Sequence, residues 1–191
     1  MNKFYTLLQD PVRWSLVVLG AAIVSGVWIW ASAVPADTTT GGLIPSPREG
    51  FLAPDFTLET LSGDQISLPD LRGNAIVLNL WASWCPPCRA EMPALQSVYQ
   101  ENHERGLEVL AVNITAQDNL AAVEAFAHEF NLTFPILLDT SGLVGKEYLM
   151  RAFPTTFFID REGIIQRVIV GGPMSEVTLQ STVERLLEET P

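Results

Sequence analysis

The chain contains two cysteines, Cys85 and Cys88, and two prolines separate them. Two thiols at this spacing can form and break a disulfide, which is the chemistry of dithiol redox proteins. The pair lies between a dense apolar run and a segment with helical character, so we expect Cys85 at a helix N-terminus. The free N–H groups and the dipole at that position stabilise a thiolate. Cys85 is therefore predicted to be an exposed nucleophile, and Cys88 the thiol that resolves a mixed disulfide.

Three other uses of the pair compete with a redox dithiol. A purely structural disulfide would close too short a loop to add much stability. A zinc site needs further ligands, and the only histidines, His103 and His128, lie on predicted helices. A copper site of two thiolates would usually have a histidine or methionine nearby, and Met92 is close in sequence. We predict a redox-active disulfide without metal or cofactor, with copper handling as the alternative.

The charge of the 191-residue chain argues against nucleic-acid binding. It has 22 acidic and 11 basic residues, for a net charge of −11, whereas phosphate contacts need clustered Lys and Arg. The excess of acid is uneven, because residues 1–36 carry a net charge of +1 and residues 37–191 one of −12. Two cysteines also exclude a scaffold of several disulfides.

An apolar run of 21 residues, from Trp14 to Val34, contains no charge. A helix of that length spans about 30 Å, the thickness of the hydrocarbon core of a bilayer. Two basic residues precede the run and the first charge after it is acidic. The positive-inside rule then predicts a cytoplasmic N-terminus over residues 1–13, a single-pass anchor in the cell membrane over residues 14–34, and an extracytoplasmic remainder. A cleaved signal peptide is the alternative, and it implies the same compartment.

Residues 35–54 contain four prolines, three glycines and three threonines, a composition typical of a flexible linker. Residues 55–191 then alternate strand and helix patterns, which predicts an α/β domain with an N-terminal β-hairpin. The expected strands are 56–58, 65–68, 75–81, 107–114, 134–138, 155–160 and 164–170. The expected helices are 86–104, 119–130, 142–149 and 176–189.

The run NLWASWCPPCRAEMP at residues 79–93, together with FPTTFFID at residues 153–160, resembles the thioredoxin fold. More narrowly, it is similar to the membrane-anchored TlpA/ResA-type thiol–disulfide oxidoreductases, relatives of the CcmG proteins of cytochrome c maturation. The resemblance covers about residues 50–189. It implies a thioredoxin-like fold with a central mixed sheet flanked by helices. The helix and strand between residues 116 and 138 match the unit that the TlpA-like branch inserts.

The resemblance also implies roles for individual residues. Cys85 matches the attacking cysteine, Cys88 the resolving cysteine, and Pro154 the cis-proline that faces the dithiol and helps to hold substrate. Glu91 matches a glutamate that acts in proton transfer near the dithiol, and burial there should raise its pKa. Solvent exposure on a helix is the alternative for Glu91. The substrate-binding candidates are Trp84, Pro86, Pro87, Phe153, Pro154 and Thr155.

Asn79 departs from thioredoxin, which has a buried aspartate at the corresponding position. Because an asparagine cannot titrate, Glu91 is the better candidate for relaying the proton of Cys88. Packing is the expected role of Trp81, whereas Trp84 should shape the surface around Cys85.

The expected function is that of an extracytoplasmic enzyme that reduces disulfides in exported proteins, apocytochrome c among them. A membrane thiol electron donor would re-reduce it, and we expect a monomer without a nucleic-acid partner. An oxidant of the DsbA kind would better suit a histidine between the cysteines than two prolines. A copper-handling protein for oxidase assembly is one alternative. A peroxiredoxin-like peroxidase is the other, although it would need a Thr-x-x-Cys loop where Ser83 and Trp84 precede Cys85.

Overall fold

The computed structural model describes residues 11–31 and 44–188. The chain divides into two units, residues 1–42 and 43–191, of which the first contains helix α1 (Pro11–Ala31). Among the described residues, no helix is long and apolar enough to cross a membrane, so the predicted anchor over residues 14–34 is not supported. Residues 1–10, the end of that apolar run and the first nine residues of the predicted linker, 35–43, lie outside the described residues.

A mixed sheet of five strands lies at the centre of the second unit, in the order β5–β4–β3–β6–β7. Its strands are β3 (Ala75–Trp81), β4 (Leu107–Asn113), β5 (Ile136–Leu138), β6 (Thr155–Ile159) and β7 (Ile165–Val170). Strands β3, β4 and β5 run parallel, while β6 is antiparallel to both β3 and β7. Every residue of the central strand β3 is buried, as its unbroken apolar run predicts.

The predicted β-hairpin is present as a separate two-stranded sheet of β1 (Thr57–Glu59) and β2 (Gln65–Ser67). The helices of this unit are α2 (Pro86–Asn102), α3 (Leu120–Glu129), α4 (Leu143–Glu147) and α5 (Glu176–Glu188). Short 3₁₀ helices occur at Leu68–Leu71, His103–Arg105 and Thr115–Gln117. The central mixed sheet with flanking helices confirms the predicted thioredoxin-like α/β fold.

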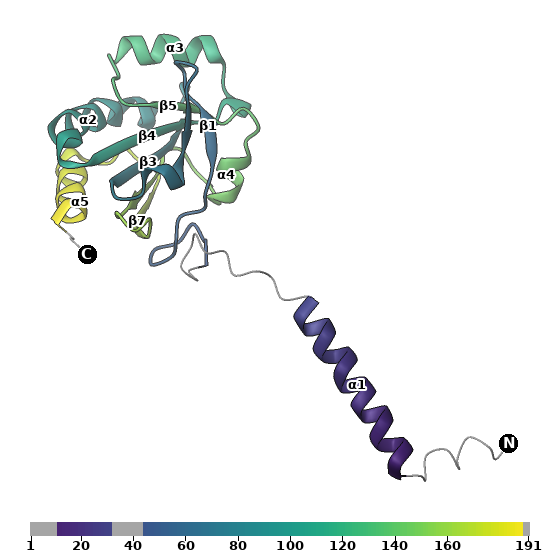
Figure 1. Ribbon diagram of the computed structural model, residues 1–191. Coiled ribbons are helices and arrows are strands. Elements are labelled where there is room, and N and C mark those ends of the chain that lie inside the picture. The colour runs from purple at the N-terminus through teal and green to yellow at the C-terminus, as the bar shows by residue number, and fades with distance from the viewer. Residues whose placement is uncertain (1–10, 32–43, 189–191) are drawn as a thin grey trace. The chain divides into compact units, whose positions relative to one another are not determined.

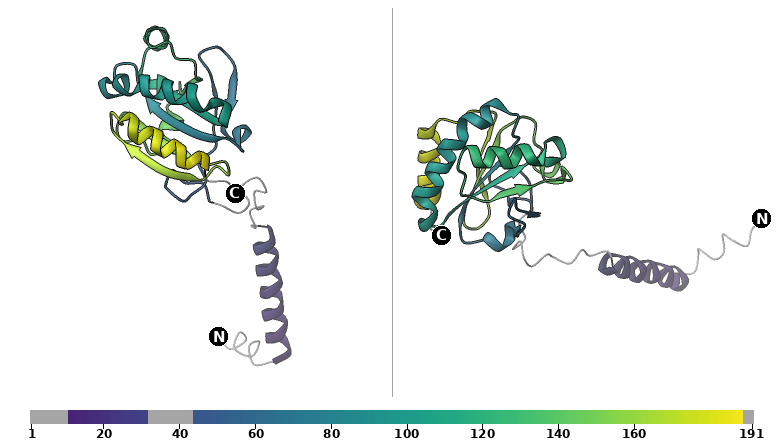
Figure 2. Two further views of the ribbon diagram at one scale, coloured as in Figure 1. Left: turned by 90° about the vertical axis from the view of Figure 1, so that its left-hand side faces the viewer. Right: turned by 90° about the horizontal axis from the view of Figure 1, so that it is seen from above.

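Helices cover both faces of the central sheet (Figure 1). Helices α2, α3 and α5 pack on one face, where Trp81 lies 4.6 Å from Phe126 between ring centroids, and α2 and α5 lie side by side (Figure 2). Helix α4 and the region of the hairpin cover the other face, where Phe56, Tyr148 and Phe157 form a second apolar cluster. This arrangement buries both sides of the sheet, as a parallel core requires.

Most elements end within one or two residues of their predicted bounds. Two of those that are shorter than predicted have a clear physical reason. Strand β5 begins at Ile136, two residues later than expected, because Pro135 has no N–H with which to extend the ladder. Helix α4 ends at Glu147, and Leu149 has a positive φ of 49° that cannot continue a right-handed helix.

The functional side chains are brought together by the direction of the strands. The carboxyl ends of the parallel strands β3, β4 and β5 meet at one edge of the sheet. Because β6 is antiparallel to β3, its first residue lies at that same edge. The loops that follow β3, β4 and β5 and the loop that precedes β6 are therefore neighbours. Cys85 lies at the end of the loop after β3, and Pro154 lies in the loop before β6.

Candidate active site

Cys85 and Cys88 form a disulfide at the N-terminus of α2, with an S–S distance of 2.12 Å and Cα atoms 5.3 Å apart. Cys85 is the N-cap residue, and its Sγ accepts a hydrogen bond from the backbone N–H of Cys88 at 3.2 Å. Pro86 and Pro87 occupy the first two helical positions, where a missing N–H costs no helical hydrogen bond. After reduction of the disulfide, the N-terminal dipole of α2 would favour the thiolate of Cys85.

Cys85 is less accessible than predicted. Its exposed fraction is 2% and that of Cys88 is 0%, whereas the neighbouring Trp84 is 56% exposed. Both cysteines belong to the apolar cluster between the sheet and α2. The expectation of an exposed Cys85 is therefore wrong for the disulfide form, because the bridge holds its sulfur within this cluster.

Glu91 lies one helical turn after Cys88 and is only 2% exposed. Its Oε1 accepts a hydrogen bond from the side-chain amide of Asn79 at 2.8 Å, and its Oε2 accepts one from the backbone N–H of Met174 at 3.1 Å. Burial raises the pKa of Glu91, against the opposing effect of these two hydrogen bonds. Glu91 is thus a buried carboxyl next to the dithiol in sequence and on the same helix, and the alternative of a solvent-exposed glutamate is excluded.

The peptide bond between Phe153 and Pro154 is cis, as the resemblance implies. Pro154 is buried at the beginning of β6, and its carbonyl accepts a hydrogen bond from the N–H of Gly171 at 2.7 Å. The hydroxyl of Thr155 donates to the carbonyl of Ala152 at 2.7 Å. Since Thr155 is 2% exposed, its side chain closes this loop and is not at the surface.

The segment from Gly171 to Met174 was not singled out in the sequence. It contains a second cis bond, between Gly172 and Pro173. A Cβ placed on Gly172 would lie 2.8 Å from Cγ of Pro154 and 3.0 Å from Oε2 of Glu91. A glycine is therefore required for this segment to approach both residues so closely.

Trp84 presents an exposed aromatic surface beside the dithiol. Its ring lies 5.2 Å from that of Phe153, at an angle of 84°. Its Nε1–H donates a hydrogen bond to the carbonyl of Gln117 at 2.9 Å. The ring is thus held in place from the loop after β4 and from the loop before β6, while more than half of it stays open to solvent. Pro86 is also exposed at the dithiol and Pro87 is half-buried.

Asp118 fixes the loop that carries Trp84, a role that the sequence did not reveal. Its carboxylate accepts hydrogen bonds from the N–H and the hydroxyl of Ser83, each at 2.6 Å, and from the side-chain amide of Asn113 at 2.8 Å. Partial burial acts to raise the pKa of Asp118, but the hydrogen bonds lower it below its usual value. The next residue, Asn119, is the N-cap of α3.

The sequence matches the AhpC/TSA family over residues 50–168. The chain belongs to this family. It is 46% identical over 125 residues to the thioredoxin-like protein YneN of Bacillus subtilis, and the aligned region covers 65% of the chain and 72% of that protein. It is 40% identical over 139 residues to the thiol-disulfide oxidoreductase ResA of Geobacillus kaustophilus, which covers 73% of the chain and 76% of that protein.

A solved structure of a related protein indicates the same enzyme class. A thiol:disulfide interchange protein of the thioredoxin family from Chlorobium tepidum matches with a TM-score of 0.65 and 30% identity, over 71% of this chain and 95% of that one. The protein is therefore a thioredoxin-like, ResA-like thiol–disulfide oxidoreductase of the AhpC/TSA family. The predicted family and the predicted enzyme class are confirmed.

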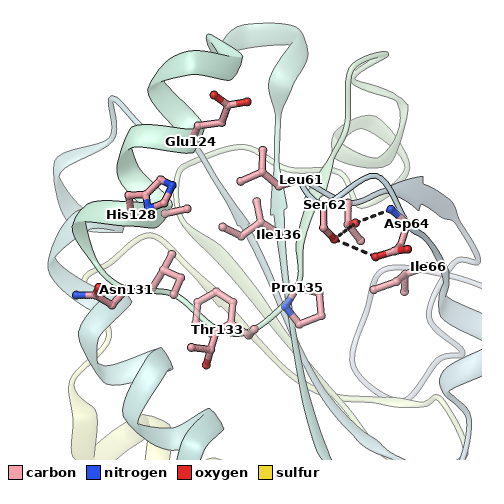
Figure 3. Close-up of a pocket in the computed structure, with 14 residues that line it drawn as sticks. Leu61, Ser62, Asp64, Ile66, Glu124, His128, Asn131, Thr133, Pro135 and Ile136 are labelled. Atoms are coloured by element: carbon pink, nitrogen blue, oxygen red, sulfur yellow. Dashed lines mark hydrogen bonds between the residues drawn. The ribbon is translucent and has the colours of Figure 1, made fainter.

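A pocket of about 860 Å³ lies away from the two sequence motifs, among the β-hairpin, α3 and β5. Leu61 and Ile136 line it together with Asp64, Glu124 and His128 (Figure 3). None of its lining residues belongs to the dithiol loop or to the loop before β6. Within the described part of the chain, no group of three or more His, Cys, Asp or Glu side chains is arranged to hold a metal ion.

Proposed function

We propose that this oxidoreductase works outside the cytoplasmic membrane and reduces disulfides in exported proteins. The carrying observation is the Cys85–Cys88 disulfide at the N-terminus of α2, with the buried carboxyl of Glu91 one turn further along the same helix. An attacking thiolate, a resolving thiol and a proton acceptor are the three groups that such a reaction needs.

In the reduced enzyme, the thiolate of Cys85 attacks one sulfur of the substrate disulfide and expels the other as a thiolate. A mixed disulfide between Cys85 and the substrate results. Glu91 then takes the proton of Cys88, and the Cys88 thiolate attacks Sγ of Cys85. The second substrate sulfur leaves, so the substrate has gained two electrons and the enzyme holds the Cys85–Cys88 disulfide. A membrane thiol electron donor returns it to the dithiol.

The extracytoplasmic location and the substrate class rest on the sequence. The uncharged apolar run at residues 14–34, with two basic residues before it, supports export of the redox domain and its attachment to the cell membrane. The resemblance to proteins related to cytochrome c maturation supports apocytochrome c as one substrate.

A cysteine trap tests the substrate class. In bacterial cells that express the full chain, Cys88→Ser should accumulate mixed disulfides, because Cys85 can attack but nothing releases the substrate. Non-reducing gels and mass spectrometry of the adducts should find exported proteins, including apocytochromes c, released by dithiothreitol. Cys85→Ser is the matched control and should form none of these adducts. If the two variants trap the same few proteins, Cys85 is not the attacking residue.

A labelling experiment tests the location. A membrane-impermeant maleimide added to intact, reduced cells should modify the wild-type chain and not a Cys85→Ser/Cys88→Ser variant. Modification only after the cells are lysed would place the dithiol in the cytoplasm. Recovery of the protein in the membrane fraction after a carbonate wash would establish attachment, and its release would exclude it.

A further inference from the structure

A groove of about 350 Å³ lies between α4 and the loop that follows it, at residues 142–151. Its lining residues are Gly142, Gly145, Lys146, Leu149, Met150 and Arg151. The side chains of Lys146, Leu149 and Arg151 are exposed. The groove therefore combines two cationic side chains with apolar surface.

The two cations in this groove are unpaired within the described part of the chain. Arg72, Arg89 and Arg105 each form an ion pair with a carboxylate, whereas no ion pair or side-chain hydrogen bond involves Lys146 or Arg151. Both cations line one groove of a region that carries a net charge of −12 over residues 37–191. An unpaired pair of cations in a strongly acidic domain can attract a carboxylate from another molecule.

One wall of the groove packs against the loop that holds Trp84. A Cβ placed on Gly142 would lie 3.2 Å from Cβ of Ala116, which shows how closely α4 approaches the loop after β4. The next residue of that loop, Gln117, accepts the hydrogen bond of the Trp84 indole. The groove and the exposed ring of Trp84 thus both contact the loop after β4.

The C-terminal end of the groove continues along the chain into the loop that contacts Trp84. Arg151 is three residues before Pro154, and Phe153 contacts the ring of Trp84. Leu149 has a left-handed φ of 49°, a conformation that is unfavourable for a residue with a branched side chain. Nevertheless the N–H groups of Leu149 and Met150 are held by the carbonyls of Lys146 and Gly145, each at 3.0 Å. The backbone thus fixes this turn while Leu149 stays 53% exposed.

We propose that this groove binds an acidic side chain of the substrate polypeptide, a few residues from the disulfide that is reduced. Lys146 and Arg151 would pair with the carboxylate, and Leu149 would contact an apolar neighbour. The two carboxylates nearest in sequence do not occupy this role. Asp139 is buried and accepts hydrogen bonds from Ser141 and Gly145, and Glu147 does not line the groove. The inference rests on the proposed reduction of protein disulfides.

Two disulfide-bonded peptides that differ only in Glu against Gln near one cysteine provide the test. The reduced full-length chain should reduce the Glu peptide about 3- to 10-fold faster than the Gln peptide at low ionic strength, the range expected for two exposed charge pairs. The difference should shrink in high salt because the charges are screened. Tryptophan fluorescence during stopped-flow mixing gives both rate constants.

Lys146→Gln/Arg151→Gln should remove the preference, and Lys146→Glu/Arg151→Glu should reverse it. Arg48→Gln/Arg185→Gln also removes two positive charges, both outside the groove, and is the control for net charge that should keep the preference. Equal rates for the two peptides with the wild-type chain would overturn the inference while leaving the proposed function intact. No reduction of either peptide would instead refute the proposed function. A preference that survives in Lys146→Gln/Arg151→Gln would also overturn the inference.

Discussion

The side-chain amide of Asn79 donates hydrogen bonds both to Oε1 of Glu91, at 2.8 Å, and to the hydroxyl of Thr156, at 2.9 Å. One residue thereby connects β3, α2 and β6 behind the dithiol. Oδ1 of Asn79 is buried and has no hydrogen-bond partner among the described residues. If the amide turned by half a rotation, this oxygen would face Glu91 and could accept a hydrogen bond from a protonated carboxyl. Asn79 can therefore partner Glu91 in either protonation state.

Glu91→Gln should slow the resolving step by about 100-fold at neutral pH, the lower end of the range for general base catalysis. Because burial raises the pKa of Glu91, the wild-type rate should rise with pH as this carboxyl ionises and becomes able to accept the proton of Cys88. The variant should lose that rise and follow only the ionisation of the thiol. Stopped-flow fluorescence of the mixed disulfide from pH 4 to 9 would measure both profiles. Superimposable profiles would remove Glu91 from the mechanism.

The stability of the folded chain should also depend on Glu91. A carboxyl whose pKa is raised on folding stabilises the folded state below its unfolded pKa, and this contribution is lost as the pH rises through the folded pKa. The free energy of unfolding of Glu91→Gln, relative to wild type, should therefore increase between pH 4 and pH 8. Urea unfolding at a series of pH values checks the sign. A relative stability that falls with pH would mean that Glu91 is better stabilised as a carboxylate in the folded chain.

Asn79→Ala should affect the resolving step less than Glu91→Gln does. The substitution removes one of the two hydrogen bonds that oppose the raised pKa of Glu91, so the midpoint of the pH–rate profile should move to higher pH. The rate above that midpoint should stay close to that of the wild type, since the proton acceptor is still present. Equal losses in the two variants at every pH would show that Asn79 and Glu91 act only as a structural pair.

Much of this architecture could be predicted from local patterns. The dense apolar run of β3 indicated a buried central strand, and the position of Cys85 and Cys88 after it indicated a helix N-terminus. The spacing of Glu91 from Cys88 indicated that the two share a side of the helix, whereas the burial of Glu91 was implied by the family resemblance, with solvent exposure as the alternative. These features depend on residues that are close in sequence, where spacing alone determines which side chains share a face.

Contacts between distant residues could not be predicted in this way. The carboxylate of Asp118 binds Ser83, and the N–H of Met174 binds Glu91, but no periodicity relates the members of these pairs. They meet because segments that are far apart in the sequence converge at one edge of the sheet. The low exposure of Cys85 was missed for a similar reason, since the apolar cluster around it is assembled from both α2 and α5.

Asp118→Asn should destabilise the chain and slow the attack by Cys85. The carboxylate accepts hydrogen bonds from the N–H and hydroxyl of Ser83 and thereby fixes the backbone just before Trp84. A hydrogen bond to a charged group contributes about 1.5–3 kcal/mol to stability. Because Asp118 is partly exposed, we expect the whole substitution to cost about 1.5 kcal/mol. Hydrogen bonding lowers the pKa of Asp118 on folding, so its contribution is present at neutral pH and is lost as the pH falls through the folded pKa.

The comparison of Asp118→Asn with wild type should therefore show a large difference in unfolding free energy at pH 7 and a small one at pH 3. Asp64→Asn is a suitable control, because Asp64 lies at the turn of the β-hairpin and its carboxylate contacts only the exposed hydroxyl of Ser62 among the described residues. A stability difference that does not change with pH would mean that the charge of Asp118 contributes nothing beyond the shape of its side chain.

Gly172→Ala should slow both half-reactions, because the new methyl group cannot be accommodated without moving the site. It would lie 2.8 Å from Cγ of Pro154 and 3.0 Å from Oε2 of Glu91, both of which are buried. Relief requires a shift of the loop before β6 or of the glutamate, and overpacking of this kind costs about 1–3 kcal/mol. Urea unfolding measures that cost, and peptide reduction measures the loss of rate. Unchanged rates in a destabilised variant would show that the loop before β6 tolerates displacement, and that close approach of the 171–174 segment serves folding and not the reaction.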